Sequence, residues 1–200
     1  MKKSIIAAGA ASAVLAAMPV LGVFADTTGI TDTIEITVEA TCTFNTGDSS
    51  VASDTTYSDT VANGAIAQLS NGSAHKFNVF CNDTDGWKVT AGTPNNLTPP
   101  AASTTNSHVI TYQASALPAA NAATEGAWIA TVSGAGVSAE LSGITTVSNV
   151  NYIATTGGII AQEGASTDGS SFTVTYGAYV GTETAADTYT GTIGYTLAAL

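Results

Sequence analysis

Positive charge is almost absent from this 200-residue chain. It has no arginine and only four lysines, Lys2, Lys3, Lys76 and Lys88, against fifteen Asp and Glu residues. Proteins bind phosphate groups mainly through arginine and lysine. The scarcity of both excludes nucleic acid as a partner and disfavours binding to anionic lipid surfaces.

Long hydrophobic runs are missing after residue 25. Residues 1–25 have a basic start and an alanine-rich apolar stretch, and Val23 and Ala25 supply the small residues that precede a signal-peptidase site. This order is typical of a secretory signal peptide. A retained membrane anchor is the alternative, but Ala, Gly and Pro make the stretch weakly hydrophobic. We expect an exported mature chain, residues 26–200, that folds as one domain without a membrane span. Losing two lysines would change its formal net charge from −11 to −13.

Cysteine is scarce too, with two residues in the whole chain. Cys42 lies in Ile34–Phe44 (IEITVEATCTF), where every second residue is apolar, and Cys81 follows Phe77 and Val79 on the apolar face of KFNVFC. Both cysteines therefore lie on the core-facing side of their predicted strands. Two cysteines of an exported chain pair more often than they serve as reactive thiols. We predict a Cys42–Cys81 disulfide in the core, worth roughly 3–4 kcal/mol by the loop-entropy estimate.

Groups that carry catalysis are few. His75 and His108 are the only histidines, and neither lies in a nucleophile motif such as Gly-x-Ser-x-Gly. A Ser-His-Asp site stays open as an alternative, since its members need not be adjacent in sequence. Two surface histidines are the simpler interpretation, so we expect a protein that is not an enzyme. Two histidines and two oxidised cysteines also leave zinc without a ligand set.

Asp83 and Asp85 are a weak candidate for a metal site, as calcium ligands. They belong to Asn82–Gly86 (NDTDG), which spaces oxygen ligands like the start of a calcium loop but lacks the downstream glutamate. Asp, Asn and Gly are also the residues of ordinary tight turns. The turn is the preferred interpretation, and we predict no cofactor.

The chain is rich in Thr, Ser, Ala and Gly around short alternating apolar runs, which is typical of an all-β extracellular protein. The alternation predicts about nine or ten short strands. Strands at this spacing favour an antiparallel β-sandwich, Ig-like or jelly-roll-like. The alanine-rich Leu117–Glu125 could hold a short helix. The proline-containing Gly92–Ser107 predicts a long exposed loop suited to binding.

Two pairs of runs predict hairpins. Lys76–Asn82 would pair with Trp87–Ala91 across the turn Asp83–Gly86. Phe172–Val180 would pair with Tyr189–Leu197 across a glycine-containing connection. Each pair would therefore lie side by side in one sheet.

Trp87 and Trp128 are the candidates for contact with a glycan or another partner. Aromatic faces stack on the apolar faces of sugars, so these two could form a binding platform. Both lie in alternating runs, where aromatic side chains more often fill the core. The sequence leaves the two interpretations open.

The N-terminal half resembles pilin-type and spore-coat-U-type subunits of bacterial surfaces. The resemblance rests on an alternating strand that leads into a first cysteine (ITVEATCTF) and a later strand that ends in a second (FNVFC). It implies an immunoglobulin-like sandwich that can polymerise by lending a strand to its neighbour.

A second resemblance is to the WxL surface domain of Gram-positive bacteria. Asp85–Ala91 (DGWKVTA) is similar to its first Trp-x-aliphatic motif, and Asp187–Leu197 is similar to its terminal strand, with Tyr195 in place of a tryptophan. That family is implied to bind cell-wall peptidoglycan non-covalently. Both resemblances imply a location on the bacterial surface.

These observations together predict a non-enzymatic, exported bacterial cell-surface protein with a structural or adhesive role, such as a pilus-like or coat subunit. Its partners would be other surface subunits or further copies of itself. The alternative is a WxL-like module that binds cell-wall glycan.

Overall fold

The computed structural model describes residues 35–44, 56–69, 74–101 and 108–200, and these ranges contain strands and loops but no helix. The predicted all-β class is therefore confirmed. The strands of the described ranges are β1 (Cys42–Phe44), β2 (Ile66–Leu69), β3 (His75–Cys81), β4 (Trp87–Ala91), β5 (Ile110–Tyr112), β6 (Gly126–Gly134), β7 (Ile144–Val147), β8 (Val150–Ile153), β9 (Gly158–Glu163), β10 (Thr167–Tyr179) and β11 (Tyr195–Ala199).

The chain divides into two units, Met1–Thr37 and Val38–Leu200, and all of these strands belong to the second. The predicted signal peptide and the domain boundary at residue 26 lie outside the described residues. Within the part of the chain that the structure describes, there is no helix able to cross a membrane.

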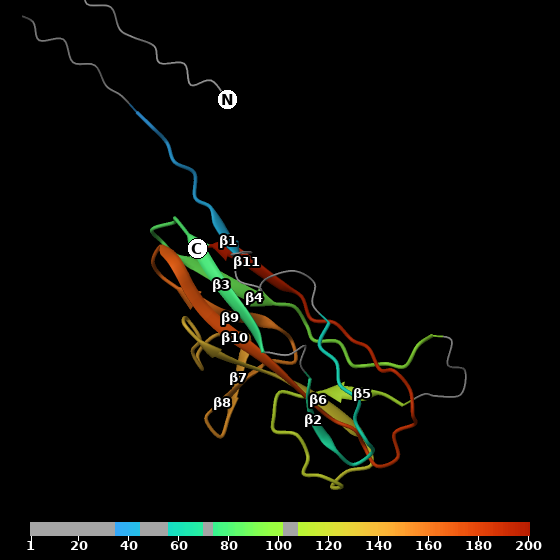
Figure 1. Ribbon diagram of the computed structural model, residues 1–200. Helices are drawn as coiled ribbons and strands as arrows, with labels where there is room; N and C mark the ends of the chain where they lie inside the picture. Colours follow the sequence, from blue (N-terminus) through green and yellow to red (C-terminus); the bar gives the residue numbers. More distant parts are fainter. Residues whose placement is uncertain (1–34, 45–55, 70–73, 102–107) are drawn as a thin grey trace, which may run out of the picture. The chain divides into compact units, whose positions relative to one another are not determined.

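Two sheets make up the second unit (Figure 1). The larger sheet runs in the order β1-β3-β10-β6-β8-β7, with β2 also on β10 and β5 also on β6. The smaller sheet is β11-β4-β9. The β5–β6 pair is parallel, and the other described pairs are antiparallel. The long strand β10 organises the larger sheet, since β2, β3 and β6 all pair with it.

The core lies between the inward faces of the two sheets. Phe77 and Phe172 sit opposite each other on β3 and β10 and stack with ring centroids 4.7 Å apart. Trp87 and Val89 enter the same cluster from β4 in the smaller sheet. Burying each such side chain contributes roughly 1.5–3 kcal/mol. The alternating residues of each run therefore pack the sandwich, as predicted.

Both predicted hairpins are wrong in their pairing, although their strands exist. β3 belongs to the larger sheet and β4 to the smaller one, and β10 and β11 are divided in the same way. Each connection therefore crosses from one sheet to the other. The alternation in each run requires one buried face, and a crossing satisfies that requirement as well as a hairpin does.

The predicted eleven-residue strand Ile34–Phe44 is also wrong in length. Only Cys42–Phe44 is a strand, and Glu35–Thr41 is not. The register places Cys42 opposite Cys81, the last residue of β3. Val38–Ala40 therefore lie beyond the end of β3, where the chain turns away toward β4, and have no partner among the described strands.

Two connections differ from expectation in smaller ways. Leu117–Glu125 contains turns instead of the short helix that its alanines allowed. The turn between β7 and β8 places Ser148 and Asn149 at positive φ, 50° and 63°. That is the geometry of a two-residue type I′ turn, which usually carries Asn-Gly or Asp-Gly. The sequence Ser-Asn therefore gave little signal for it.

Candidate functional site

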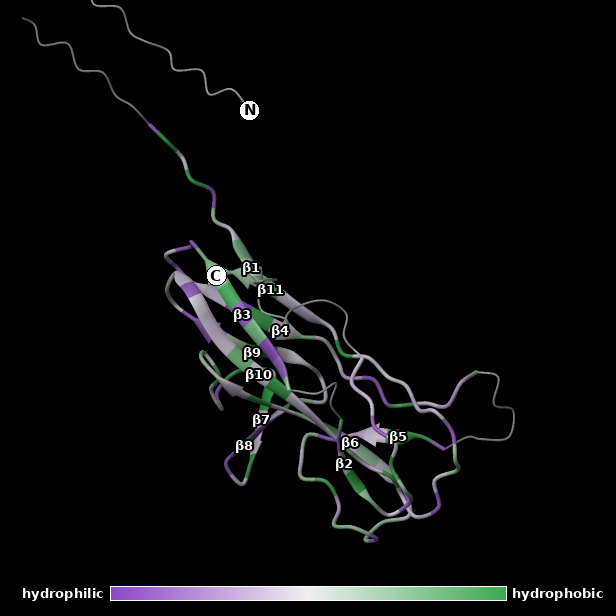
Figure 2. Cartoon of the chain, viewed as in Figure 1, coloured by the Kyte–Doolittle hydropathy of each residue, from purple (hydrophilic) through white to green (hydrophobic). Residues whose placement is uncertain are grey.

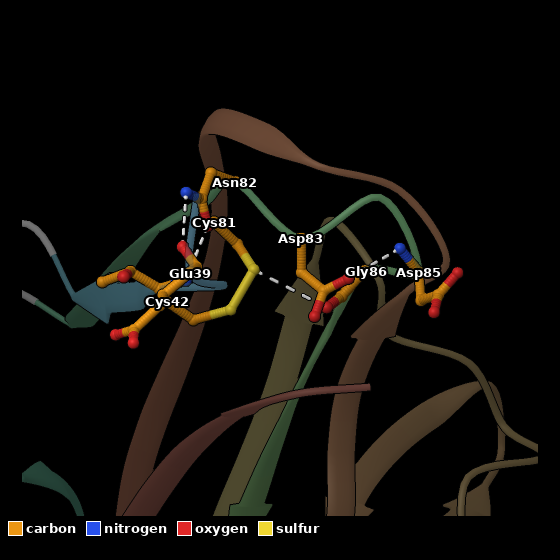
Figure 3. The surroundings of a disulfide bond; sticks show 8 residues. Glu39, Cys42, Cys81, Asn82, Asp83, Asp85 and Gly86 are labelled. Atoms are coloured by element: carbon orange, nitrogen blue, oxygen red, sulfur yellow. Dashed lines mark hydrogen bonds between the residues drawn. A yellow bond between two sulfur atoms is a disulfide. The ribbon is translucent and has the colours of Figure 1, made fainter. Parts of the chain in front are cut away.

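A disulfide fastens β1 to the end of β3, which confirms the predicted pairing of Cys42 with Cys81. The two residues face each other directly, with 4.1 Å between their Cα atoms. The neighbouring Asn82 N–H donates to the Thr41 carbonyl. The cysteines therefore form a non-hydrogen-bonded pair, the position at which opposite side chains lie closest. Figure 3 shows the bond and its surroundings.

The side chain of Asn82 fixes the backbone that precedes β1. Its Oδ1 accepts from the Thr41 N–H at 2.6 Å, and its Nδ2 donates to the Glu39 carbonyl at 3.1 Å (Figure 3). The regular pairing of β1 with β3 ends at Cys42 and Cys81, and before that point these two side-chain bonds hold the backbone instead. The sequence predicts Asn82 as the end of a strand and the first residue of the NDTDG stretch, and nothing in the residue pattern indicates a long-range amide contact.

The loop from β3 to β4 is a turn. Asp83 Oδ1 accepts from the Asp85 N–H at 2.9 Å, and the Gly86 N–H donates to the Asp83 carbonyl. One carboxylate oxygen thus caps the turn. The Gly86 carbonyl lies 3.6 Å from Cys81 Sγ, a contact only, because an oxidised sulfur carries no hydrogen. In the described part of the chain, no group of three or more His, Cys, Asp or Glu is placed to hold a metal ion.

Two large apolar side chains lie exposed just before β1. Ile36 is 82% exposed and Val38 is 77% exposed. They alternate with Glu35, Thr37 and Glu39, so this stretch presents one apolar and one polar face when extended, and Figure 2 shows its alternating hydropathy. We call Glu35–Thr41 the leading segment. The apolar face predicted to enter the core is therefore the most exposed apolar surface among the described residues.

Strand β11 is the end strand of the smaller sheet and contacts β1 without pairing with it. The Gly92 N–H donates to Gly194, and the Leu200 N–H donates to Gly86. With this register, the backbone groups of Tyr195, Leu197 and Ala199 point away from β4. In the described part of the chain, no strand pairs with that outer side. Such an edge is a ready template for another strand.

The two tryptophans are buried. Trp87 is 0% exposed and Trp128 is 3% exposed. Trp128 packs edge-on against Tyr112, with 4.6 Å between ring centroids. Neither indole offers a face to a sugar or a protein, so contact from the surface is not available to them in this fold. The core interpretation of both residues is the correct one.

His75 also lies in the interior, at 7% exposure, which corrects its interpretation as a surface histidine. Its ring stacks on Phe77 at 4.1 Å and lies near Tyr57 and Tyr195. Nε2 has no hydrogen-bond partner among the described residues. Burial lowers the pKa of His75, because the charged imidazolium would lose its hydration. His108 is exposed, as predicted.

A pair of tyrosines links the two sheets beside this histidine. The hydroxyls of Tyr176 on β10 and Tyr195 on β11 lie 2.8 Å apart and share a hydrogen bond. Burial raises the pKa of both phenols. Tyr195 thus serves as a polar contact within the core, and its aromatic ring packs on Phe77 at 4.9 Å.

The surface of the described part has open grooves, and two of them are relevant to a binding site. One, of about 480 Å³, lies between Asn95–Thr98 and Thr190–Thr192. One wall of this groove belongs to the predicted binding loop Gly92–Ser107, of which residues 92–101 are described. This part of the loop is held in place, because Leu97 bonds to Ile110 and Thr98 bonds to Thr190 through paired backbone hydrogen bonds. The remaining residues of the loop, 102–107, lie outside the described residues.

The second groove, of about 740 Å³, lies across the ends of β1, β3 and β10. Phe80 is its aromatic residue. The polar residues that line it include Thr41, Thr43, Asn82, Ser166 and Asp168. Neither groove contains a histidine.

Comparison with known proteins gives no relationship for this chain: no family model, no curated protein and no solved structure matches it.

Proposed function

We propose that this chain is an exported, non-enzymatic protein of the bacterial cell surface, with a structural or adhesive role like that of a pilus or coat subunit. It associates with further copies of itself through the leading segment. The signal-peptide pattern of residues 1–25 supports export. The Cys42–Cys81 disulfide supports it too, since such bonds form and persist in oxidising compartments.

The observation that carries the proposal is the exposure of Ile36 and Val38 in a segment with strand-like alternation. Leaving such side chains in water forgoes roughly 1.5–3 kcal/mol each. An alternating segment recovers this energy when it joins the edge of a sheet, because its backbone forms hydrogen bonds while one face is buried.

The segment's own chain does not supply that edge at β3. The disulfide fixes the register of β1, and β3 ends opposite Cys42. A second copy can supply an edge through β11. Its outward backbone groups at Tyr195, Leu197 and Ala199 alternate, as strand addition requires. The segment's apolar face would then enter the second copy beside the half-buried Leu197.

Size-exclusion chromatography with light scattering tests the association. The wild-type chain is expected to form multimers whose mass rises with concentration. Replacing both apolar residues, Ile36→Ser with Val38→Ser, is expected to leave a monomer. The matched control is Val147→Ser with Val150→Ser, since these valines are also exposed, at 37% and 40%, but lie in the β7–β8 hairpin. A wild-type monomer at all concentrations, or equal losses in both variants, would reject the association.

Location requires a separate experiment. Cell fractionation and surface imaging with an antibody to this chain are expected to find it outside the cytoplasm, with residues 1–25 removed. A cytoplasmic chain that keeps its N-terminal residues would contradict the proposal.

A further inference from the structure

We propose that the groove across β1, β3 and β10 is a binding site for neutral saccharides, with Phe80 as its stacking platform. The proposal does not depend on Ile36 and Val38, because neither lines this groove, and Thr41 is the residue of the leading segment that does. The proposed adhesive surface lies on the outer face of the larger sheet, the face that points away from the core.

The strand register puts three of the groove residues, Thr43, Phe80 and Asp168, on one face. Thr43 and Asp168 both lie directly opposite Phe80, on the two strands that flank β3. Directly opposite residues of neighbouring strands point to the same side of a sheet. Val79 and Cys81, on either side of Phe80, are 0% and 4% exposed and face the core. Phe80 therefore lies on the outer face, in a row with a hydroxyl and a carboxylate.

Phe80 is an exception to the pattern of its own strand. Its outer-face neighbours on β3 are Lys76 and Asn78, both polar. A bulge in β10 between Asp168 and Ser170 brings Gly169 beside the ring, where a Cβ would lie 3.7 Å from Phe80 Cζ. The glycine leaves the ring without a covering side chain at that position. The sequence contained this signal, an aromatic residue at a polar position of an alternating run.

The polar groups around the ring have capacity to bind. The side chains of Thr43, Ser166 and Asp168 form no hydrogen bond with the rest of the described chain. Thr167 differs, because its hydroxyl already bonds within the β10 bulge. Two hydroxyls and a carboxylate beside an aromatic ring match the chemistry of a sugar, whose hydroxyls form hydrogen bonds and whose C–H face stacks on aromatic carbon.

Charge and size restrict the class of sugar. The groove contains the Asp168 carboxylate and no lysine, and the whole chain carries a net charge of −11. An acidic saccharide would meet like charge, so neutral hexoses and N-acetylhexosamines fit best. The volume of this open groove, about 740 Å³, lies within the range of small-ligand sites.

An NMR titration of the isotope-labelled chain tests the site, with cellohexaose and chitohexaose as neutral probes and trigalacturonate as the acidic probe. At least one neutral probe is expected to shift the amide signals of Thr43, Phe80 and Asp168, and trigalacturonate is expected to shift none of them. Phe80→Leu keeps an apolar side chain of similar size but removes the ring, and it is expected to weaken binding by roughly 10-fold. Asp168→Asn is expected to weaken it less.

The matched control is Ile66→Ala, which removes an exposed apolar side chain on β2, outside the groove. It is expected to leave binding unchanged. The Ile36→Ser, Val38→Ser variant is expected to bind normally, which separates this result from the test of self-association. No shift with either neutral probe, shifts confined to other regions, or equal binding by Phe80→Leu and wild type would each overturn the proposal.

Discussion

The leading segment and β1 come from one alternating run of sequence, yet they differ completely in structure. β1 pairs with β3 and is joined to it covalently, whereas Ile36 and Val38 are largely exposed. The residue types are the same, and the alternation does not change between them. The difference is the length of β3, which ends opposite Cys42. Alternation decides which face of a strand is apolar, and only a neighbouring strand decides whether that face is buried.

The largest expected effect comes from removing the covalent link that distinguishes β1. Replacing Cys42 and Cys81 with alanine opens a loop with a sequence separation of 39. The loop-entropy relation predicts a loss of about 4 kcal/mol in the free energy of unfolding. Urea unfolding followed by fluorescence measures it, and hydrogen exchange should show β1 becoming as unprotected as the leading segment. Reduced wild-type protein is the control and should lose the same amount. An unchanged urea midpoint would show that strand pairing alone holds β1.

A smaller effect, dependent on pH, is expected at the other end of β3, where His75 is buried among aromatic rings. Burial lowers the folded-state pKa of His75 below its ordinary value of 6.5. The unfolded chain therefore binds a proton more readily than the folded one. The contribution of neutral, buried His75 to the free energy of unfolding should be fully present above pH 6.5. It should be lost progressively as the pH falls below 6.5 toward the lower folded-state pKa.

The variant His75→Phe keeps the stacking on Phe77 and cannot be protonated. Urea unfolding at a series of pH values should show a flatter acid limb for this variant than for wild type. His108→Phe, at an exposed position, is the control and should keep the wild-type slope. Identical slopes for wild type and His75→Phe would mean that burial of this histidine does not affect acid stability.

A still smaller effect is expected from Asn82, which orders the backbone at the boundary between the two regions. Asn82→Ala removes two exposed hydrogen bonds, to Thr41 and Glu39, and should cost about 0.5–1 kcal/mol. Hydrogen exchange should show faster exchange of the Thr41 amide. Asn82→Asp keeps the acceptor for Thr41 and loses only the donor, so its Thr41 amide should stay protected. Equal protection of the Thr41 amide in wild type and Asn82→Ala would show that Asn82 does not order this backbone.

The smallest effect on folding is expected from the exposed residues themselves. Ile36→Ser with Val38→Ser should change the unfolding free energy of the monomer by less than about 0.5 kcal/mol, because neither side chain is buried. Val79→Ala, at a fully buried position of β3, should cost about 2 kcal/mol. Calorimetry at low protein concentration compares the two. A large loss in the leading-segment variant would mean that these residues pack within their own chain.

Much of the fold could be predicted from the sequence, because the alternation of apolar residues indicates strands and their buried faces, and the presence of just two cysteines indicates their pairing. The strand at Phe77–Cys81, the inward faces of Phe172 and Val174, and the disulfide all follow from residue spacing. Pairing could not be predicted in the same way. The runs around Trp87 and Tyr195 have the pattern of hairpin partners, but a crossing between sheets buries the same faces.

The candidate sites were harder to predict for a related reason. The exposure of a side chain depends on where the neighbouring strands end. The sequence therefore left a surface platform open for Trp87 and Trp128, although both residues are buried in the core. The burial of His75 likewise depends on Tyr57 and Tyr195, which are distant in sequence. Phe80 carried a local signal, as an aromatic residue at a polar position of its run, although we did not predict it as a site residue.

Hydrogen exchange of the leading segment at low and high protein concentration tests the central claim most directly. At low concentration the amides of Glu35–Thr37 are expected to exchange freely, since no strand pairs with them there. At high concentration their protection should rise together with that of Leu197 on β11, because one copy's segment pairs with the other's edge. Exchange that stays fast at every concentration, while multimers form, would contradict the account.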